Sequence, residues 1–117
     1  GAVFGLGAAL PNSSPLKVDL ICYASSKSVD LQAGAGPTMA NQKLLKLFRT
    51  PGGTTAKFGS ISELPTEKPQ DGDRDMVHHA QAGNGFVLEN NISGGHTRIF
   101  VKEASTAKVV LEYQMVP

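Results

Sequence analysis

Two stretches near the end of the chain decide the fold: Thr97–Glu103 (TRIFVKE) and Ala107–Val116 (AKVVLEYQMV). Apolar and polar residues alternate along both, as they do in a β-strand with one buried face. Only the short segment Ala104–Thr106 separates them. The expected inward residues are Ile99 and Val101 in the first stretch and Ala107, Val109, Leu111, Tyr113 and Met115 in the second.

The same alternation recurs earlier in the chain. Leu16–Tyr23 (LKVDLICY) predicts a strand, and Val29–Ala33 predicts a second one that forms a hairpin with it. The Gly83–Gly85 turn precedes another predicted strand, Phe86–Asn90. The expected inward residues are Leu16, Val18, Leu20 and Cys22 in the first strand and Val29, Leu31 and Ala33 in the second.

Short strands with turn residues between them are typical of a sandwich or a small barrel. The sequence therefore predicts a mainly β chain in which residues 1–117 form a single domain. We expect an antiparallel immunoglobulin-like or jelly-roll sandwich of about 7 to 8 strands.

Residues 39–49 depart from this pattern. Ala40, Leu44, Leu47 and Phe48 recur at helical spacing among residues that favour helices, which predicts one short helix. The alternative is that the segment KLLKLF within this range forms a buried strand. The helix would be an insertion in an otherwise β fold.

Ser62–Asp75 is the most polar stretch, with two prolines and seven charged residues, and is predicted to be a surface loop. Within it, Asp71, Asp73 and Asp75 have the spacing at which a curled loop brings carboxylates around Ca²⁺. An EF-hand is excluded, because Ala82 occupies the position of the bidentate glutamate. The alternative is a solvated turn in which these side chains accept hydrogen bonds from nearby backbone N–H groups.

His78, His79 and His96 are candidates for a zinc site or for a small-molecule site in the loops. Adjacent residues on a strand point to opposite faces, so His78 and His79 meet one ion only if the backbone there is irregular. Structural histidines, one facing the core or a turn and the other facing water, are the alternative.

No motif indicates catalysis. Cys22 is the single cysteine and is expected to be buried and inert, and it excludes an intrachain disulfide. The chain has neither a G-x-S-x-G elbow nor the lysine of a P-loop after Pro51–Thr55. We therefore predict a protein that is not an enzyme and needs no cofactor. The 11 basic and 10 acidic residues argue against a nucleic-acid partner.

The first ten residues, Gly1–Leu10, carry no charge and precede a loop rich in proline and serine. They are too few to cross a membrane as a helix, so no transmembrane segment is expected. The interpretations are an ordinary first strand, a leftover targeting segment, or an arm that pairs with a partner subunit. The residues that alternate onto one face, and would form a partner strand, are Ala2, Phe4, Leu6, Ala8 and Leu10.

Several segments of the chain resemble subunits of bacterial chaperone-usher fimbriae. They are the apolar segment Ala2–Leu10, the stretch Val18–Leu20 followed by Ala24–Ser25 and Val29–Gly34, and the last strand Val109–Gln114, which contains Tyr113. The resemblance implies an immunoglobulin-like sandwich, secreted or displayed on the cell surface, whose groove accepts a donor strand. We therefore expect a structural or interaction module that works by self-assembly or with a protein partner. The alternatives are a carbohydrate-binding or other small-ligand jelly roll, and a metal-dependent enzyme or metal-binding domain that uses the aspartates and histidines above.

Overall fold

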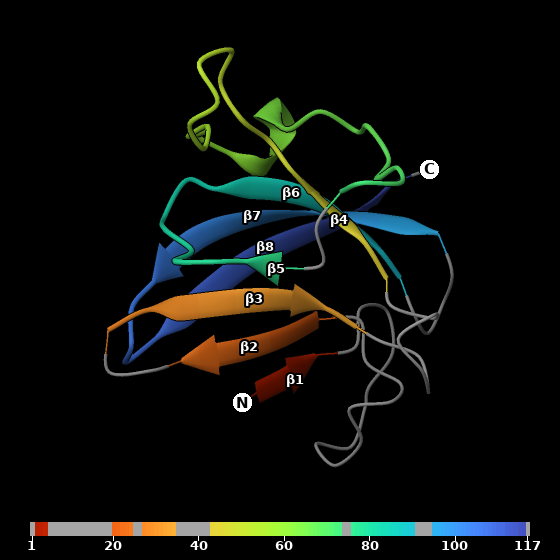
Figure 1. Cartoon of the computed structure of the whole chain (residues 1–117). Coiled ribbons are helices and arrows are strands. Elements are labelled where there is room, and N and C mark those ends of the chain that lie inside the picture. The colour runs from red at the N-terminus through yellow and green to blue at the C-terminus, as the bar shows by residue number, and fades with distance from the viewer. Residues whose placement is uncertain are drawn as a thin grey trace.

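The computed structural model describes residues 2–4, 20–24, 27–34, 43–73, 76–90 and 95–116, with only the backbone of residues 2–4. The described strands form two four-stranded antiparallel sheets (Figure 1). The first sheet has the order β1-β2-β3-β5 and the second sheet has the order β4-β6-β7-β8. The strands are β1 (Ala2–Phe4), β2 (Leu20–Ala24), β3 (Val29–Ala33), β4 (Leu45–Leu47), β5 (Met76–Val77), β6 (Gly85–Glu89), β7 (His96–Ala104) and β8 (Val109–Val116). The prediction of a mainly β sandwich is confirmed.

The two sheets pack face to face around an inner core. Its members alternate along the strands as the sequence predicts, because side chains two residues apart share one face of a sheet. The fully buried large side chains of this core are Leu20, Leu31, Leu45, Val77, Phe86, Leu88, Ile99 and Val101. Burial of this apolar surface is the main favourable term that holds the sheets together.

The predicted hairpin between β2 and β3 is confirmed, with Leu20 opposite Ala33 and Ala24 opposite Val29. The sequence range proposed for its first strand began at Leu16, but residues 16–19 lie outside the described residues. In the second sheet β7 and β8 pair over nearly their whole length, from His96 opposite Val116 to Ala104 opposite Val109.

The predicted helix over residues 39–49 is wrong for the part that the structure describes. Leu45–Leu47 is strand β4, which pairs antiparallel with β6, and residues 39–42 lie outside the described residues. Leu45 and Leu47 both pack in the inner core, as two residues that share one face of a strand do. The edge of β6 supplies hydrogen-bond partners that a helix would leave unused, which outweighs local helix propensity.

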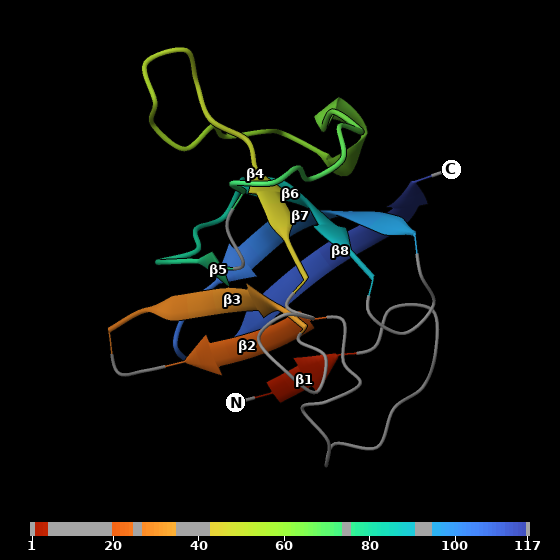
Figure 2. The same cartoon turned by 45° about the vertical axis from the view of Figure 1, so that its right-hand side comes forward.

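A second core covers the outer face of the second sheet. Figure 2 shows the chain between β4 and β5 lying over this sheet, on the side away from the first sheet. This loop carries the 3-10 turn η3 (Ile61–Glu63). The buried members are Phe48, Leu64, Val87 and Phe100, with Ala56, Phe58, Ile61 and Val116 packed against them. The described part of the predicted polar loop, residues 62–73, is therefore a surface segment that is also anchored through buried Leu64.

The expected inward residues of the last strand are only partly buried. Val109 and Leu111 pack against the inner core, whereas Tyr113 is 55% exposed and Met115 is 44% exposed. Ala107 lies before β8 and is exposed. The prediction that these three side chains are buried is wrong, because among the described strands β8 has no neighbour beyond β7 and its C-terminal half is not fully covered.

Candidate functional site

The outer edge of β8 is the most distinctive surface of the described chain. Among the described residues β8 pairs with β7 alone. The register places Thr97 opposite Met115 and Ile99 opposite Tyr113. Thr97 and Ile99 are fully buried, while their neighbours on β8 are largely exposed. The inner face of the sandwich therefore becomes accessible over one strand width at this edge.

Met115 is held in place by polar neighbours. The Thr97 hydroxyl donates to Asn90 Oδ1 at 2.7 Å and lies 3.2 Å from Met115 Sδ. Asn90 Nδ2 approaches the same sulfur at 3.8 Å. The exposed Met115 side chain therefore packs against two residues, Thr97 and Asn90, that are hydrogen-bonded to each other.

The backbone of β8 also presents hydrogen-bonding groups at this edge. Val101 donates its N–H to Asn84 O and accepts from Gly83 N, so its backbone groups point toward β6. The backbone N–H and C=O groups of successive residues in an antiparallel strand point to opposite sides of the strand. Those of Phe100 therefore point toward β8, and those of its partner Glu112 point toward β7. The N–H and C=O groups of Leu111, Tyr113 and Met115 consequently point away from β7, toward the open edge.

The polar side chains of β8 are tied to β7. Glu112 forms an ion pair with Lys102 at 3.4 Å, and Gln114 Oε1 accepts hydrogen bonds from Arg98, with Nε at 2.8 Å and with Nη2. Edge strands usually avoid pairing with strands of other molecules by being short or by carrying proline or charged side chains. The eight-residue strand β8 has no proline and a single charged residue, which is already paired.

The structure describes two of the three aspartates of the predicted calcium site, Asp71 and Asp73. Asp71 is exposed, and Asp73 Oδ2 accepts a hydrogen bond from Gln70 N at 2.7 Å while Asp73 N donates to Gln70 O. This is the side-chain-to-backbone turn that the sequence offered as the alternative. Asp75 lies outside the described residues. Within the described part of the chain, no group of three His, Cys, Asp or Glu residues is arranged to hold a metal ion.

The structure does not bring the three histidines together. Asp30 joins the first two, because its carboxylate lies 3.6 Å from His78 Nδ1 and accepts a hydrogen bond from His79 N at 2.9 Å. His79 also lines a cleft of ≈ 230 Å³ together with Ala104. His96 begins β7, whereas Ala104 ends this nine-residue strand roughly 26 Å away.

A larger cleft, which the sequence did not reveal, lies on the outer face between β4 and the loop that covers it. It measures ≈ 610 Å³. Phe48 and Phe58 form an edge-to-face pair in its wall, with ring centroids 6.1 Å apart, and the Lys46–Glu67 ion pair (3.6 Å) lies at its rim. An apolar wall with charged groups beside it suits a small amphipathic ligand. Residues 46 and 67 are too far apart in the chain for any local motif to indicate this contact.

Cys22 lies in the inner core, and burial raises the pKa of its thiol above the ordinary value of 9.0. The thiol is therefore protonated near neutral pH, as the sequence analysis expected of an inert cysteine.

The N-terminal strand β1 pairs antiparallel with β2, with Ala2 opposite Cys22 and Phe4 opposite Leu20. For these residues the interpretation as an ordinary first strand matches the backbone pairing. Leu6, Ala8 and Leu10 lie outside the described residues, so the partner-strand hypothesis stays a prediction.

No helix among the described residues is long and apolar enough to cross a membrane. In comparisons with protein-family models, curated proteins and solved structures, nothing matches this chain.

Proposed function

We propose that this chain is a non-enzymatic interaction module that works through protein–protein assembly, with the outer edge of β8 as its contact surface. The observation that carries the proposal is the exposure of Tyr113 and Met115 on an otherwise apolar strand face, beside backbone groups that point outward. Such an edge can accept an additional strand from a protein partner. Backbone hydrogen bonds would then supply affinity, and alternate side chains would supply specificity.

The donor in a fimbria-like version of this proposal is the uncharged segment Gly1–Leu10 of another copy. Its alternating residues have the length and composition of an inserted strand. In the described backbone only Ala2–Phe4 of this segment forms a strand, at the edge of the first sheet. Donation of a terminal strand to a free sheet edge of another copy is a form of strand addition. Secretion or surface display follows from the fimbrial resemblance alone and stays a prediction.

Amide hydrogen exchange tests whether a strand adds to β8. Leu111, Tyr113 and Met115 are expected to exchange rapidly in dilute protein, because their N–H groups point toward the open edge. Their exchange should slow as protein concentration rises, or when a synthetic peptide with the sequence of Gly1–Leu10 is added. Glu112 and Gln114 point toward β7 and serve as internal controls, since their exchange should stay slow throughout.

A scrambled peptide of the same composition controls for non-specific contact. The variant Leu6→Asp/Ala8→Asp of the 117-residue chain separates the donor from the acceptor, because it adds charge to the N-terminal segment and leaves β8 unchanged. The proposal is contradicted if the three amides of β8 exchange rapidly at every protein and peptide concentration.

A second candidate is the binding of a small amphipathic ligand in the ≈ 610 Å³ cleft on the outer face. The observation that favours it is the Phe48–Phe58 pair, an apolar wall that lies beside charged groups of both signs. These groups are Lys46, Arg49, Glu67 and Asp73. A thermal-shift screen with glycans and with aromatic carboxylates tests this function, because a bound ligand raises the melting temperature. Loss of the shift in Lys46→Ala, but not in Lys102→Ala, would locate the ligand in the cleft.

A further inference from the structure

We infer that the occupant of the β8 edge is β8 of a second copy, paired antiparallel about a two-fold axis that passes through Tyr113. This inference rests on the proposed function and names its partner. An isologous contact of this kind joins two second sheets into one continuous sheet. It requires that β8 be complementary to itself in both backbone and side chains.

The backbone limits the possible registers. Outward-pointing residues must face one another, so Leu111, Tyr113 and Met115 must pair among themselves across the axis. Among the symmetric registers that satisfy this condition, those centred on Glu112 and on Tyr113 overlap the most residues of β8. The register centred on Glu112 places two carboxylates directly opposite each other, which is destabilising. The register centred on Tyr113 avoids this contact.

Side chains match in the Tyr113-centred register. On the inner face Tyr113 meets its own copy and Leu111 meets Met115, so the exposed apolar surface of each chain is covered by apolar surface. On the outer face Glu112 lies opposite Gln114. Because Arg98 already engages Gln114 Oε1, the Gln114 amide NH₂ group is left to donate to the Glu112 carboxylate of the second copy.

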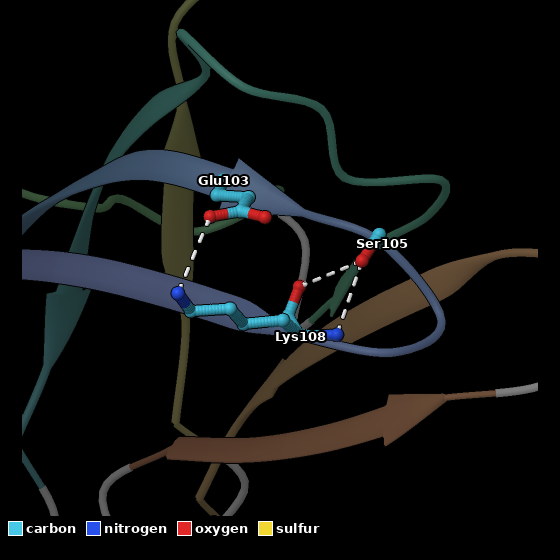
Figure 3. A network of polar contacts seen from close by, with 3 residues as sticks. All are labelled: Glu103, Ser105 and Lys108. Atoms are coloured by element: carbon cyan, nitrogen blue, oxygen red, sulfur yellow. Dashed lines mark hydrogen bonds and ion pairs between the residues drawn. The ribbon is translucent and has the colours of Figure 1, made fainter.

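The β7–β8 hairpin is already ordered before pairing. Ser105 N donates to Lys108 O at 2.9 Å, and Lys108 N donates to Ser105 O at 3.3 Å. Figure 3 shows the Ser105 side chain bonded to the same two backbone groups, since Ser105 Oγ donates to Lys108 O at 3.2 Å and accepts from Lys108 N at 3.0 Å. Figure 3 also shows Lys108 Nζ reaching Glu103 Oε2, 3.9 Å away on the neighbouring strand. The lysine charge next to β8 is thus drawn toward β7. A preformed edge loses little conformational entropy when it pairs.

The expected dimer is weak and concentration-dependent. A single pair of strand edges buries less than the roughly 1,200 Å² of a standard interface, and the Tyr113-centred register adds about six backbone hydrogen bonds. Such a contact suits reversible association, which sedimentation or light scattering detects over a concentration series.

Disulfide trapping tests the register. Directly opposed residues in a hydrogen-bonded antiparallel pair have Cα atoms about 5.5 Å apart, within the range that a disulfide spans. In a Cys22→Ala background, Tyr113→Cys is expected to form a covalent dimer under mild oxidation. The matched control is Tyr23→Cys, which places a thiol at the exposed tyrosine of β2 and should give little dimer. Trapping of Glu112→Cys in place of Tyr113→Cys would overturn the Tyr113-centred register.

Charge insertion tests the contact without a cysteine. Tyr113→Lys and Met115→Lys alter exposed side chains, so both variants should fold, and each is expected to weaken dimerisation by at least about tenfold. Tyr23→Lys, with the same change on the first sheet, should dimerise like the wild type. Equal dimerisation of all three variants and the wild type overturns the inference.

The N-terminal segment distinguishes this inference from the proposed function. The variant Leu6→Asp/Ala8→Asp is expected to dimerise like the wild type, and with Tyr113→Cys added it is expected to form the covalent dimer. If it is monomeric and the Tyr113→Cys trap fails, the N-terminal strand of another copy is the occupant, and only the inference is overturned. A monomeric wild type whose β8 amides are protected by the Gly1–Leu10 peptide leads to the same conclusion. A monomer with unprotected β8 amides overturns both proposals.

Discussion

The side chain of Leu64 packs directly over Gly85, the first residue of β6. A Cβ at Gly85 would lie 3.2 Å from Cγ and Cδ1 of Leu64 and closer still to Cδ2. Arg98 Nη1 donates to the Leu64 carbonyl at 2.9 Å, so the same residue is held by its backbone as well. Leu64 therefore fastens the long loop between β4 and β5 to the outer face of the second sheet.

Gly85→Ala is expected to destabilise the fold by about 1–3 kcal/mol, because the added methyl group overpacks a filled site. Urea denaturation measures the change in the free energy of unfolding. Gly52→Ala is the matched control, since the nearest atom to its Cβ would be Thr50 Oγ1 at 3.8 Å. Equal stability of the two variants would show that the loop moves aside at little cost.

Thr97→Val is expected to cost about 1–3 kcal/mol, because it removes the hydroxyl that donates to buried Asn90 at 2.7 Å and keeps the shape of the side chain. Thr97→Ser keeps the hydroxyl and should cost only about 0.8 kcal/mol for the lost methyl group. Thermal and chemical unfolding compare the two variants. A valine variant as stable as the wild type would show that this hydrogen bond adds nothing to the free energy of unfolding.

Cys22 is expected to react with thiol reagents at least about tenfold more slowly in the folded chain than after denaturation, because it is buried and protonated. Ellman's reagent measures the rate, and Tyr23→Cys in a Cys22→Ala background provides an exposed thiol on the same strand. Equal rates for the two thiols would contradict the burial of Cys22.

Alkaline pH is expected to weaken the fold through the same thiol. Burial raises the pKa of folded Cys22 above its ordinary value of 9.0, so the folded chain retains this proton at a pH where the unfolded chain releases it. The resulting stability is fully present below pH 9.0 and is lost as pH rises through the folded-state pKa. Urea midpoints above and below this value, compared with those of Cys22→Ala, measure the effect. A parallel pH dependence in both proteins would assign it to other groups.

His79→Gly is expected to leave stability unchanged or raise it by up to about 1 kcal/mol, because His79 has a positive φ of 52° that glycine adopts without strain. The backbone N–H that donates to Asp30 is retained in this variant. Ala82→Gly is the control in the neighbouring turn, and it should lower stability by about 0.5–1 kcal/mol. If both glycine variants lose the same stability, the conformation of His79 stores no strain.

Local alternation predicted the strands well where each strand pairs with a neighbour that is close in the chain. The β2–β3 hairpin and the inward residues Ile99 and Val101 follow from the alternation of apolar and polar side chains along each strand. The described part of the predicted helix, residues 43–49, was mispredicted because helical spacing and strand spacing are both present there, and only the distant partner β6 selects between them. Leu64 was missed as a core residue because its neighbours in the chain are polar, while its contacts lie on β6 and β7.

The candidate site shows the same division between sequence and structure. The apolar pattern of β8 is legible in the sequence, and it predicts that Leu111, Tyr113 and Met115 share one face. Its interpretation as a buried face was wrong for Tyr113 and Met115, since periodicity reports which residues share a face and not what covers that face. By itself the sequence determined the strands β2, β3, β6, β7 and β8, the residues that share a face in them, and the sandwich class. Only the tertiary structure decided that β8 lies at the edge of the described sheet, because the order of strands depends on contacts between segments far apart in the chain.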